Sequence, residues 1–466
     1  LGRLPLRRAR MMALFRGGGV RLFVCYVLVP SSAAFRALPA RRGGAPAMTL
    51  DLSSWSELES RLPSCASTEM PTFDADTVDP AALEGATVLY ADRNRWCPDS
   101  ERVWLALELK RARYVTVLVD DDYGATPGEE GSLPRVQWPD GTSSGGSAIG
   151  AILERIEVEH PHAPNFFPRI SVTVAVVRDS LTRFDAIMPR FTRPSRLAPY
   201  VYACKIQRAD ALNPFEAEVC EVDQIVPRFK YEVCLEEIDE IMEEYRGGPF
   251  IGGEAVTAAD IYWAPYLERL NAYVPTLHRG LKVRSGAYDA ITEWFDAMDA
   301  RVPAYACRVK GRAATWQQVL AQEHPELQQE VEPTADCRGV DLPARRLSWA
   351  KARALWASYS DGRPHLAASR AGEVAAVAVR KRDALLAGYA TANPREPLSS
   401  ADADAALREV CAALIRWGEA GEEVGEQPAL SAGAQAMATY LDAGGLAVPR
   451  DLGVLPAEAL RALGQA

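Results

Sequence analysis

The sequence holds one cysteine in a setting that favours thiolate chemistry. Cys97 lies between a predicted strand over residues 87–90 and a predicted helix over residues 98–111, which opens with Pro98. The free amides and the dipole of a helix N-terminus favour a negative sulfur, and such settings lower the pKa of a cysteine from about 8.5 into the range of about 3.5 to 7.5. Because the thiolate is the nucleophile, we expect Cys97 to react near neutral pH.

The spacing around Cys97 indicates a monothiol site. The fourth position of the motif is Ser100, so an internal disulfide cannot form, and an external thiol, usually glutathione, must release any adduct. Asp99 has two opposed effects, because its carboxylate suits the helix dipole but raises the thiol pKa if it lies close to the sulfur. Other cysteines are interpreted as buried structural residues, namely Cys204, Cys220, Cys234, Cys307 and Cys411.

The elements around this motif form a β-α-β pattern followed by a strand, a turn and a helix. A β-branched run over residues 114–119 predicts a second strand, and residues 133–138 predict a third. Asp140-Gly141 is a tight-turn signal, and residues 147–158 follow it as a predicted helix. This order outlines a thioredoxin-like domain.

After residue 165, the helical spacing of apolar residues replaces the strand pattern, which predicts an all-helical unit. Predicted helices cover residues 169–188, 228–245, 258–270 and 287–298. Thr257 and Asp260 predict a capping box, a structural role, at the start of the third of these. An Ala-rich region then adds predicted helices over residues 349–358, 365–389 and 400–417, and we find no catalytic motif in it.

Two stretches, one in each unit, resemble the cysteine-type (omega-like) glutathione S-transferases, a group related to glutaredoxins. VLYADRNRWCPDSERVWLALELKRARY is similar to the first β-α-β of these proteins, which carry a Trp-Cys-Pro-Phe-Cys or Cys-Pro-Phe motif. GPFIGGEAVTAADIYWAPYLERL is similar to the end of their helical domain. The resemblance spans residues 85–320, and the ending VPRDLGVLPAEALRAL more weakly resembles algal and plant members.

This resemblance implies a fold and a set of site residues. The fold is an α/β thioredoxin-like N-terminal domain followed by an all-α glutathione-transferase C-terminal domain, with an extra C-terminal helical extension. Cys97 matches the catalytic cysteine that forms a mixed disulfide with glutathione, which is the co-substrate. The residues that match the glutathione-binding positions are Pro98, Leu133, Pro134, Gly146 and Ser147.

The resemblance also assigns roles to these positions. The backbone of Leu133 and of Pro134, expected as a cis-proline, pairs with the cysteinyl part of glutathione, and Ser147 binds the γ-glutamyl carboxylate. Two features depart from the family. Gly145 and Gly146 occupy the region in which the family has an acid just before that serine, so the expected charge-assisted bond to the glutathione amino group is missing. Asp99-Ser100 also replaces the common Phe-Cys or Phe-Tyr.

The acceptor site implied by the resemblance lies between the two domains. Tyr262, Trp263 and Tyr266 are the candidates to line it, and packing in the core along the capped helix is the competing interpretation.

Three functions stay open at this point. The first is a glutathione-dependent thiol transferase or reductase that removes glutathione from mixed disulfides or conjugates through Cys97. The second is a binding or scaffold protein on the same fold without turnover. The third and less favoured is conjugation of glutathione to electrophiles, with Ser100 as the hydroxyl. The expected partner is a small-molecule thiol, disulfide or electrophile, and a homodimer is an assembly that the sequence leaves open.

Charge and composition narrow the class. The chain has 466 residues with 52 basic and 62 acidic side chains, a net charge of −10 that argues against nucleic-acid binding. Metal binding has no support, because the histidines form no ligand spacing with cysteine. Those histidines are His160, His162, His278, His324 and His365.

Residues 1–50 differ from the rest, because they carry nine arginines and no lysine or acid. Arg16 and Arg21 precede a short apolar run over residues 22–29, which reads as a signal peptide and is too short to span a membrane. A basic, acid-free stretch then begins at Phe35 and resembles the second part of the bipartite plastid leaders of algae with secondary plastids. We therefore expect plastid localisation, with simple secretion as the alternative, and no membrane association of the mature form.

We divide the chain into five regions on these grounds. They are a bipartite targeting leader over residues 1–50, a linker over 51–84, a thioredoxin-like glutathione-binding domain over 85–160, an all-helical domain over 165–330 and a helical extension over 331–466.

Overall fold

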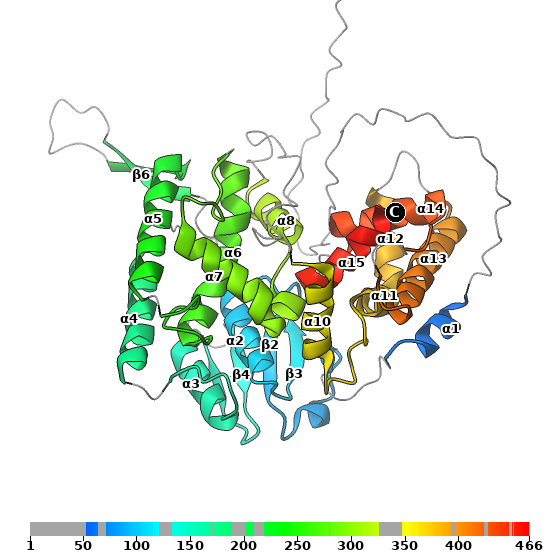
Figure 1. Cartoon of the computed structure of the whole chain (residues 1–466), viewed down its shortest axis with the longest axis horizontal. Coiled ribbons are helices and arrows are strands. Elements are labelled where there is room, and N and C mark those ends of the chain that lie inside the picture. Colours follow the sequence, from blue (N-terminus) through cyan, green and yellow to red (C-terminus); the bar gives the residue numbers. More distant parts are fainter. Residues whose placement is uncertain are drawn as a thin grey trace, which may run out of the picture.

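A computed structural model of the chain provides the structure. It describes residues 53–63, 71–120, 133–146, 148–168, 171–187, 202–208, 219–245, 247–278, 280–325, 347–392, 398–423, 427–446, 450 and 452–465. The predicted leader and Ser147 lie outside the described residues. Figure 1 shows a sheet with its helices at the centre, a helical unit beside it and a second helical unit at the C-terminal end of the chain.

The α/β unit is built on a five-stranded sheet in the order β1-β3-β2-β4-β5. Its strands are β1 (Thr72–Asp74), β2 (Val88–Asp92), β3 (Val115–Val119), β4 (Arg135–Gln137) and β5 (Ser143–Gly145). The first three pair in parallel, and β4 pairs antiparallel with both β2 and β5. Parallel neighbours need a crossover connection, and helix α2 (Pro98–Leu109) supplies it between β2 and β3. With α3 (Ile149–Glu159) after β5, this topology confirms the predicted thioredoxin-like unit.

The expected linker over residues 51–84 contains regular structure, which corrects that prediction. Helix α1 (Trp55–Ser60) begins with a capping box between Ser54 and Glu57, and a short 3-10 helix, η1 (Pro80–Leu83), precedes β2. Strand β1 forms the sheet edge next to β3. The polar composition of the segment gives no local signal for these elements. They are stabilised by partners that lie far away in the sequence.

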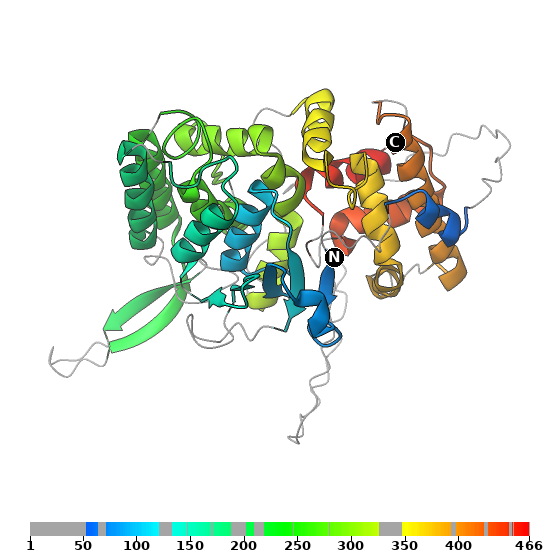
Figure 2. The same ribbon diagram turned by 90° about the horizontal axis from the view of Figure 1, so that it is seen from below.

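The second unit is mostly helical. Its elements are α4 (Ser171–Ile187), β6 (Tyr202–Arg208), β7 (Val219–Ile225), α5 (Arg228–Glu244), α6 (Ala258–Leu277), α7 (Asp289–Arg301), the π-helix η3 (Tyr305–Val309) and α8 (Ala313–Glu323). The antiparallel β6–β7 hairpin corrects the expectation that this unit has helices alone, and Figure 2 shows it projecting from the side opposite to the C-terminal unit. The predicted capping box at Thr257 and Asp260 is confirmed.

The α/β unit and the helical unit share one hydrophobic core. Buried side chains of α2 and α3, such as Val103 and Ile152, belong to the same cluster as Leu267 on α6 and Trp294 on α7. This core fixes the start of α2 against α6, and that is where the candidate site lies.

The C-terminal extension has a core of its own. Its helices are α10 (Trp349–Ser360), α11 (Arg370–Arg380), α12 (Arg382–Ala392), α13 (Ser400–Glu419), α14 (Ala432–Tyr440), the π-helix η5 (Leu441–Gly445) and α15 (Val454–Gly464). The single helix expected over residues 365–389 is two helices, because the chain turns at Lys381. Leu58 of α1 is fully buried in this core, and the Trp55 indole donates to Asp404 at 2.9 Å.

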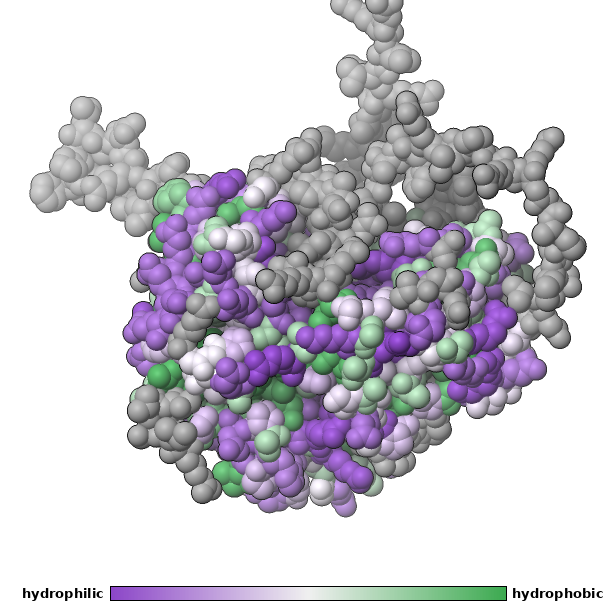
Figure 3. Space-filling view, viewed as in Figure 1, coloured by the Kyte–Doolittle hydropathy of each residue, from purple (hydrophilic) through white to green (hydrophobic). Residues whose placement is uncertain are grey.

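The extension also packs on the rest of the protein through α10 and α15, which Figure 1 shows lying between the helical unit and the other C-terminal helices. Cys307 on η3 shares a small buried cluster with Trp356 on α10 and Leu455 on α15. The described part of the face in Figure 3 is mostly hydrophilic, with apolar residues scattered over it. No helix among the described residues is long and apolar enough to cross a membrane.

Candidate active site

Cys97 lies at the start of α2, where the sequence places it. It is the N-cap residue, and Pro98 occupies the first helical turn, in which the missing proline N–H costs no hydrogen bond. Asp92, the last residue of β2, accepts from the backbone N–H of Trp96 at 2.7 Å and of Cys97 at 3.0 Å. One buried carboxylate therefore shapes the loop that presents the thiol, and Cys97 itself is 0% exposed.

Three of the segments expected around glutathione meet at one end of the sheet. Strands β2 and β4 pair with Tyr90 opposite Arg135, and this register places Leu133 and Pro134 beside the end of β2. The Leu133–Pro134 peptide bond is cis, as the resemblance implies. The backbone N–H of Gly146 donates to the Pro134 carbonyl at 3.0 Å, which brings the end of β5 to the same place.

The structure gives a physical reason for the two glycines that replace the expected acid. Gly146 has φ +67°, a left-handed conformation that favours glycine. A Cβ atom at Gly145 would lie 3.0 Å from the Pro134 carbonyl oxygen, so any larger residue would press on the backbone of the cis-proline loop. The glycines thus permit the close approach of β5 to β4. Ser147 lies outside the described residues, and its role stays a prediction.

The charge of Asp99 is neutralised within its own helix. Arg102 donates to the Asp99 carboxylate at 2.7 Å, an i,i+3 pair on α2. Arg102 is itself buried, donates to the Tyr262 carbonyl at 2.8 Å and lies 3.4 Å from the centre of the Tyr262 ring. This pairing opposes the rise in thiol pKa that an unpaired Asp99 would cause.

The three aromatic candidates for the acceptor site have different environments. Trp263 is 0% exposed in the shared core, which favours the packing interpretation. Tyr262 and Tyr266 are half-buried, and Arg102 lies over both rings. Burial, then the Asp99 charge, and then Cys97 raise the pKa of Tyr266, so its hydroxyl stays protonated beside the thiol.

A buried charge cluster that the sequence did not suggest lies beneath the Cys97 loop. Glu101 on α2 accepts from Arg269 of α6 at 3.1 Å and from Arg450 of the extension at 2.9 Å. Burial by itself raises the pKa of Glu101, but the two guanidinium groups outweigh it and hold the pKa below its usual value. Burial and then the Glu101 charge raise the pKa of the adjacent Glu268 to about 8.

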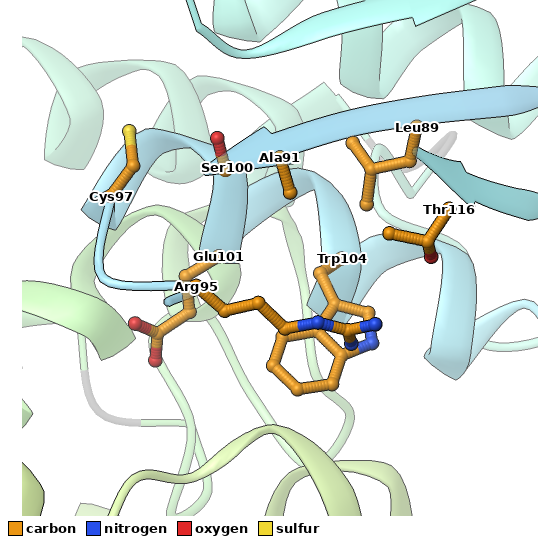
Figure 4. A pocket seen from close by; sticks show the side chains of 8 residues that line it. All are labelled: Leu89, Ala91, Arg95, Cys97, Ser100, Glu101, Trp104 and Thr116. Atoms are coloured by element: carbon orange, nitrogen blue, oxygen red, sulfur yellow. The ribbon is translucent and has the colours of Figure 1, made fainter. Parts of the chain in front are cut away.

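Figure 4 shows that the thiol of Cys97 and the carboxylate of Glu101 lie on different sides of the start of α2. The Cys97 sulfur and the Ser100 hydroxyl point to one side, and the Glu101 carboxylate points to the other, where the Arg95 side chain lies over the Trp104 ring. The cavity between them measures about 10 Å³, room for about one water molecule. A tripeptide cannot fit in this cavity.

Sequence reasoning found Cys97 and the proline loop but missed the groups that hold them. Asp92 and Arg102 had local signals, since Asp92 follows a predicted strand by two residues and Arg102 stands three residues after Asp99. Arg450 had none, because its partner Glu101 is 349 residues away. Among the described residues, no group of three or more histidine, cysteine or acidic side chains is placed to hold a metal ion.

Part of the chain matches a known family. Residues 223–297 match the family model of the glutathione S-transferase C-terminal domain. The match starts in β7 and ends in α7, within the unit that the resemblance assigned to this domain. Together with the sheet topology, it confirms the expected fold class of a thioredoxin-like domain followed by a helical glutathione-transferase domain. No curated protein sequence matches the chain.

Solved structures are similar to about half of the chain. An omega glutathione transferase, 3C, from Trametes versicolor is 19% identical over 52% of this chain and 92% of its own, with a TM-score of 0.35. The dehydroascorbate reductase of Chlamydomonas reinhardtii is 17% identical over 52% of this chain and 98% of its own, with a TM-score of 0.31. Maleylacetoacetate isomerase from Anaeromyxobacter dehalogenans, solved with glutathione in its active site, is 21% identical over 47% of this chain and 94% of its own, with a TM-score of 0.33.

Proposed function

We propose that this protein is a glutathione-dependent thiol transferase that works through a mixed disulfide at Cys97. The observation that carries the proposal is the position of Cys97 at the N-terminus of α2, at the end of the sheet where the cis Leu133–Pro134 bond and Gly146 also lie. This arrangement places a nucleophile beside the cis-proline loop, whose backbone the resemblance assigns to glutathione binding.

The reaction has two exchange steps. The Cys97 thiolate attacks the glutathione sulfur of a mixed disulfide, which forms Cys97–S–S–glutathione and releases the substrate thiolate. The thiolate of a second glutathione then attacks this adduct, which yields oxidised glutathione and regenerates the Cys97 thiolate. The dipole at the N-terminus of α2 favours the thiolate in both steps.

Glutathione has to complete the cycle because no second thiol is placed to do so among the described residues. Ser100 stands one turn after Cys97, where a resolving cysteine would be needed. Cys307 is buried, and burial raises its thiol pKa well above the usual range, so it does not form a thiolate at neutral pH. Burial likewise raises the pKa of Cys411 to about 12.

A scaffold without turnover is the second candidate, and the burial of the thiol favours it. Cys97 is 0% exposed, so glutathione reaches the sulfur only if the atoms that cover it move aside. The missing acid next to Ser147 weakens glutathione binding further. The transferase and the scaffold therefore differ in one measurable event, which is formation of the mixed disulfide.

The decisive experiment treats the protein with oxidised glutathione and measures its intact mass. We expect the wild type to gain one glutathione, to lose it to excess reduced glutathione, and to reduce a small mixed disulfide in a coupled assay. Cys97→Ser should do none of this. Cys307→Ser, which removes another buried free cysteine, serves as the matched control and should behave like the wild type.

The opposite result is equally clear. If wild type and Cys97→Ser are equally inactive and neither binds glutathione by calorimetry, the transferase proposal fails and the scaffold remains. If Ser100→Ala alone abolishes the coupling of glutathione to an electrophile, the reaction is conjugation instead.

We also propose that residues 1–50 direct the protein to a plastid. Their basic, acid-free composition and the apolar run over residues 22–29 support this. A fluorescent protein fused to residues 1–50 should enter the plastid of an alga with secondary plastids, and a fusion that carries residues 35–50 alone should stay in the cytosol. Secretion of the first fusion would overturn the proposal.

A further inference from the structure

We propose that Arg450, from the C-terminal extension, is a positioning residue for Cys97. The inference rests on the proposed function for its catalytic meaning, but it concerns a contact that can be tested without any catalysis. The extension would then be a part of the active site's support rather than an appendage.

Arg450 contacts the loop before Cys97 through both its backbone and its guanidinium group. Arg450 is 3% exposed, although it belongs to a segment 349 residues after Glu101. Its guanidinium donates to the Arg95 carbonyl at 3.0 Å and to the Val309 carbonyl, and its backbone N–H donates to the Asn94 carbonyl at 3.4 Å. Two of these acceptors belong to the loop that runs from β2 to Cys97.

A second arginine extends the same pattern to the next residue of the loop. Arg269 of α6 donates to the Trp96 carbonyl at 2.7 Å. The carbonyls of three consecutive residues before Cys97 are thus held by two arginines, while Asp92 holds the amides of Trp96 and Cys97. The loop is fixed through both its donors and its acceptors.

The loop needs such support because its backbone is strained. Arg95 has φ +57°, a left-handed conformation that a residue with a side chain adopts at a cost. Strained residues of this kind persist where the surroundings over-determine them, and they gather at functional sites. Arg450 contacts the carbonyl of that very residue.

The guanidinium is also fixed in direction, so that it acts as a rigid support. It forms an ion pair with Glu101 at 2.9 Å, and its central carbon lies 4.4 Å from the centre of the Trp316 ring. A guanidinium presents several donors in a fixed fork, whereas a lysine presents one compact ammonium group. Lysine at position 450 could keep the charge next to Glu101 but could not hold two carbonyls and the carboxylate together.

The other buried link between the extension and α2 supplies a matched control. Arg363 donates to Glu108 near the C-terminal end of α2, with its side chain 9% exposed, and touches no part of the Cys97 loop. Arg363→Met therefore breaks a comparable buried ion pair between the same two parts of the protein. Of the two variants, only Arg450→Met should change the reactivity of the Cys97 thiol.

The test measures alkylation of Cys97 by iodoacetamide as a function of pH, with the full chain and peptide mass spectrometry. The charged and titratable groups that face the loop or the cluster beneath it are Asp92, Asp99, Glu101, Arg102, Tyr266, Glu268, Arg269 and Arg450. We expect Arg450→Met to speed alkylation at high pH by about tenfold, because the loop opens, and to raise the midpoint pH by about one unit, because the sulfur is no longer held at the helix N-terminus and a nearby positive charge is lost.

Arg363→Met should leave both quantities at the wild-type values, and Arg450→Lys should restore less than half of the change. Equal profiles for the two methionine variants, or full rescue by lysine, would overturn the proposal. If Arg450→Met does not fold, hydrogen exchange of residues 93–97 in Arg450→Lys decides, with faster exchange expected. These readouts need no glutathione, so a protein without transferase activity could still confirm the positioning role.

Discussion

Helix α2 meets the C-terminal extension at both ends, and the two contacts differ in what they hold. Near its N-terminus, Glu101 is 2% exposed and accepts from Arg269 and Arg450. Two turns later, Glu108 is 3% exposed and accepts from Tyr114 at 2.7 Å and from Tyr359 at 3.0 Å, with Arg363 at 3.3 Å. Both are buried carboxylates matched by arginine, yet only the first cluster touches the loop before Cys97.

The comparison shows that a buried ion pair can join two parts of a protein and can also order the backbone of a site. Buried ion pairs rarely add stability over an apolar alternative, but breaking one by removing a single partner is costly. At the C-terminal end of α2 the pair joins the extension to the core. At the N-terminal end the same chemistry also orders the backbone that presents a nucleophile, so we expect function to respond there and stability to respond at both ends.

The largest effect should follow removal of the acid at the N-terminal end. Glu101→Gln leaves Arg269 and Arg450 buried with too little negative charge, which should cost about 3–5 kcal/mol of unfolding free energy. Urea unfolding followed by tryptophan fluorescence measures this. A loss below about 1 kcal/mol would mean that water reaches the cluster and that it is not truly buried.

The C-terminal end should respond less strongly to loss of its arginine. Arg363→Met removes one charged donor, but Glu108 keeps the hydroxyls of Tyr114 and Tyr359, so we expect a loss of about 1.5–3 kcal/mol. The same urea titration gives the number, and thiol transfer per folded molecule should stay unchanged. A fall in transfer with Cys97 alkylation unaltered would show that this end also contributes to function.

The pH dependence of stability should distinguish the two clusters further. Burial raises the pKa of Glu268, next to Glu101, from 4.5 to about 8. The folded protein therefore keeps a proton that the unfolded chain releases, so this contribution is complete below about pH 4.5 and is lost as pH rises to about 8. Each pH unit in that window costs up to about 1.4 kcal/mol.

Glu268→Gln keeps the acceptor for the Gly311 backbone N–H, which lies at 2.9 Å, and cannot ionise. Thermal unfolding between pH 5 and pH 9 should therefore be flatter in this variant than in the wild type, with the variant the more stable near pH 9. Parallel curves for the two proteins would contradict the raised pKa.

The smallest effect should come from single hydroxyls at Glu108. Tyr359→Phe removes one of the hydrogen bonds to this carboxylate while Arg363 keeps its contact, so the cost should be about 1 kcal/mol. A double-mutant cycle with Arg363→Met, measured by urea unfolding, should show coupling, since both side chains act on the same oxygen. Strict additivity would mean that the two contacts are independent.

Much of the α/β unit could be predicted from the sequence because its signals are local. The β-branched run predicted as a strand over residues 114–119 is β3, and Pro98 is the first residue of α2. The β6–β7 hairpin was not predicted. The helical periodicity of the segments on either side led us to expect helices throughout this unit. The role of Trp263 could not be predicted for a related reason. An aromatic residue on a helix has the same sequence spacing whether it packs in the core or lines a site, and only the structure shows that Trp263 is buried.

The sequence alone determined the strand, the monothiol motif and the helix start, because backbone propensity, proline geometry and capping act over a few neighbouring residues. Only the tertiary structure decided which groups surround the thiol. Asp99 forms an ion pair with Arg102, and Glu101 forms ion pairs with Arg269 and Arg450, which come from segments far along the chain. Such buried charges are matched by packing rather than by spacing, because a carboxylate removed from water requires a partner wherever the fold brings one.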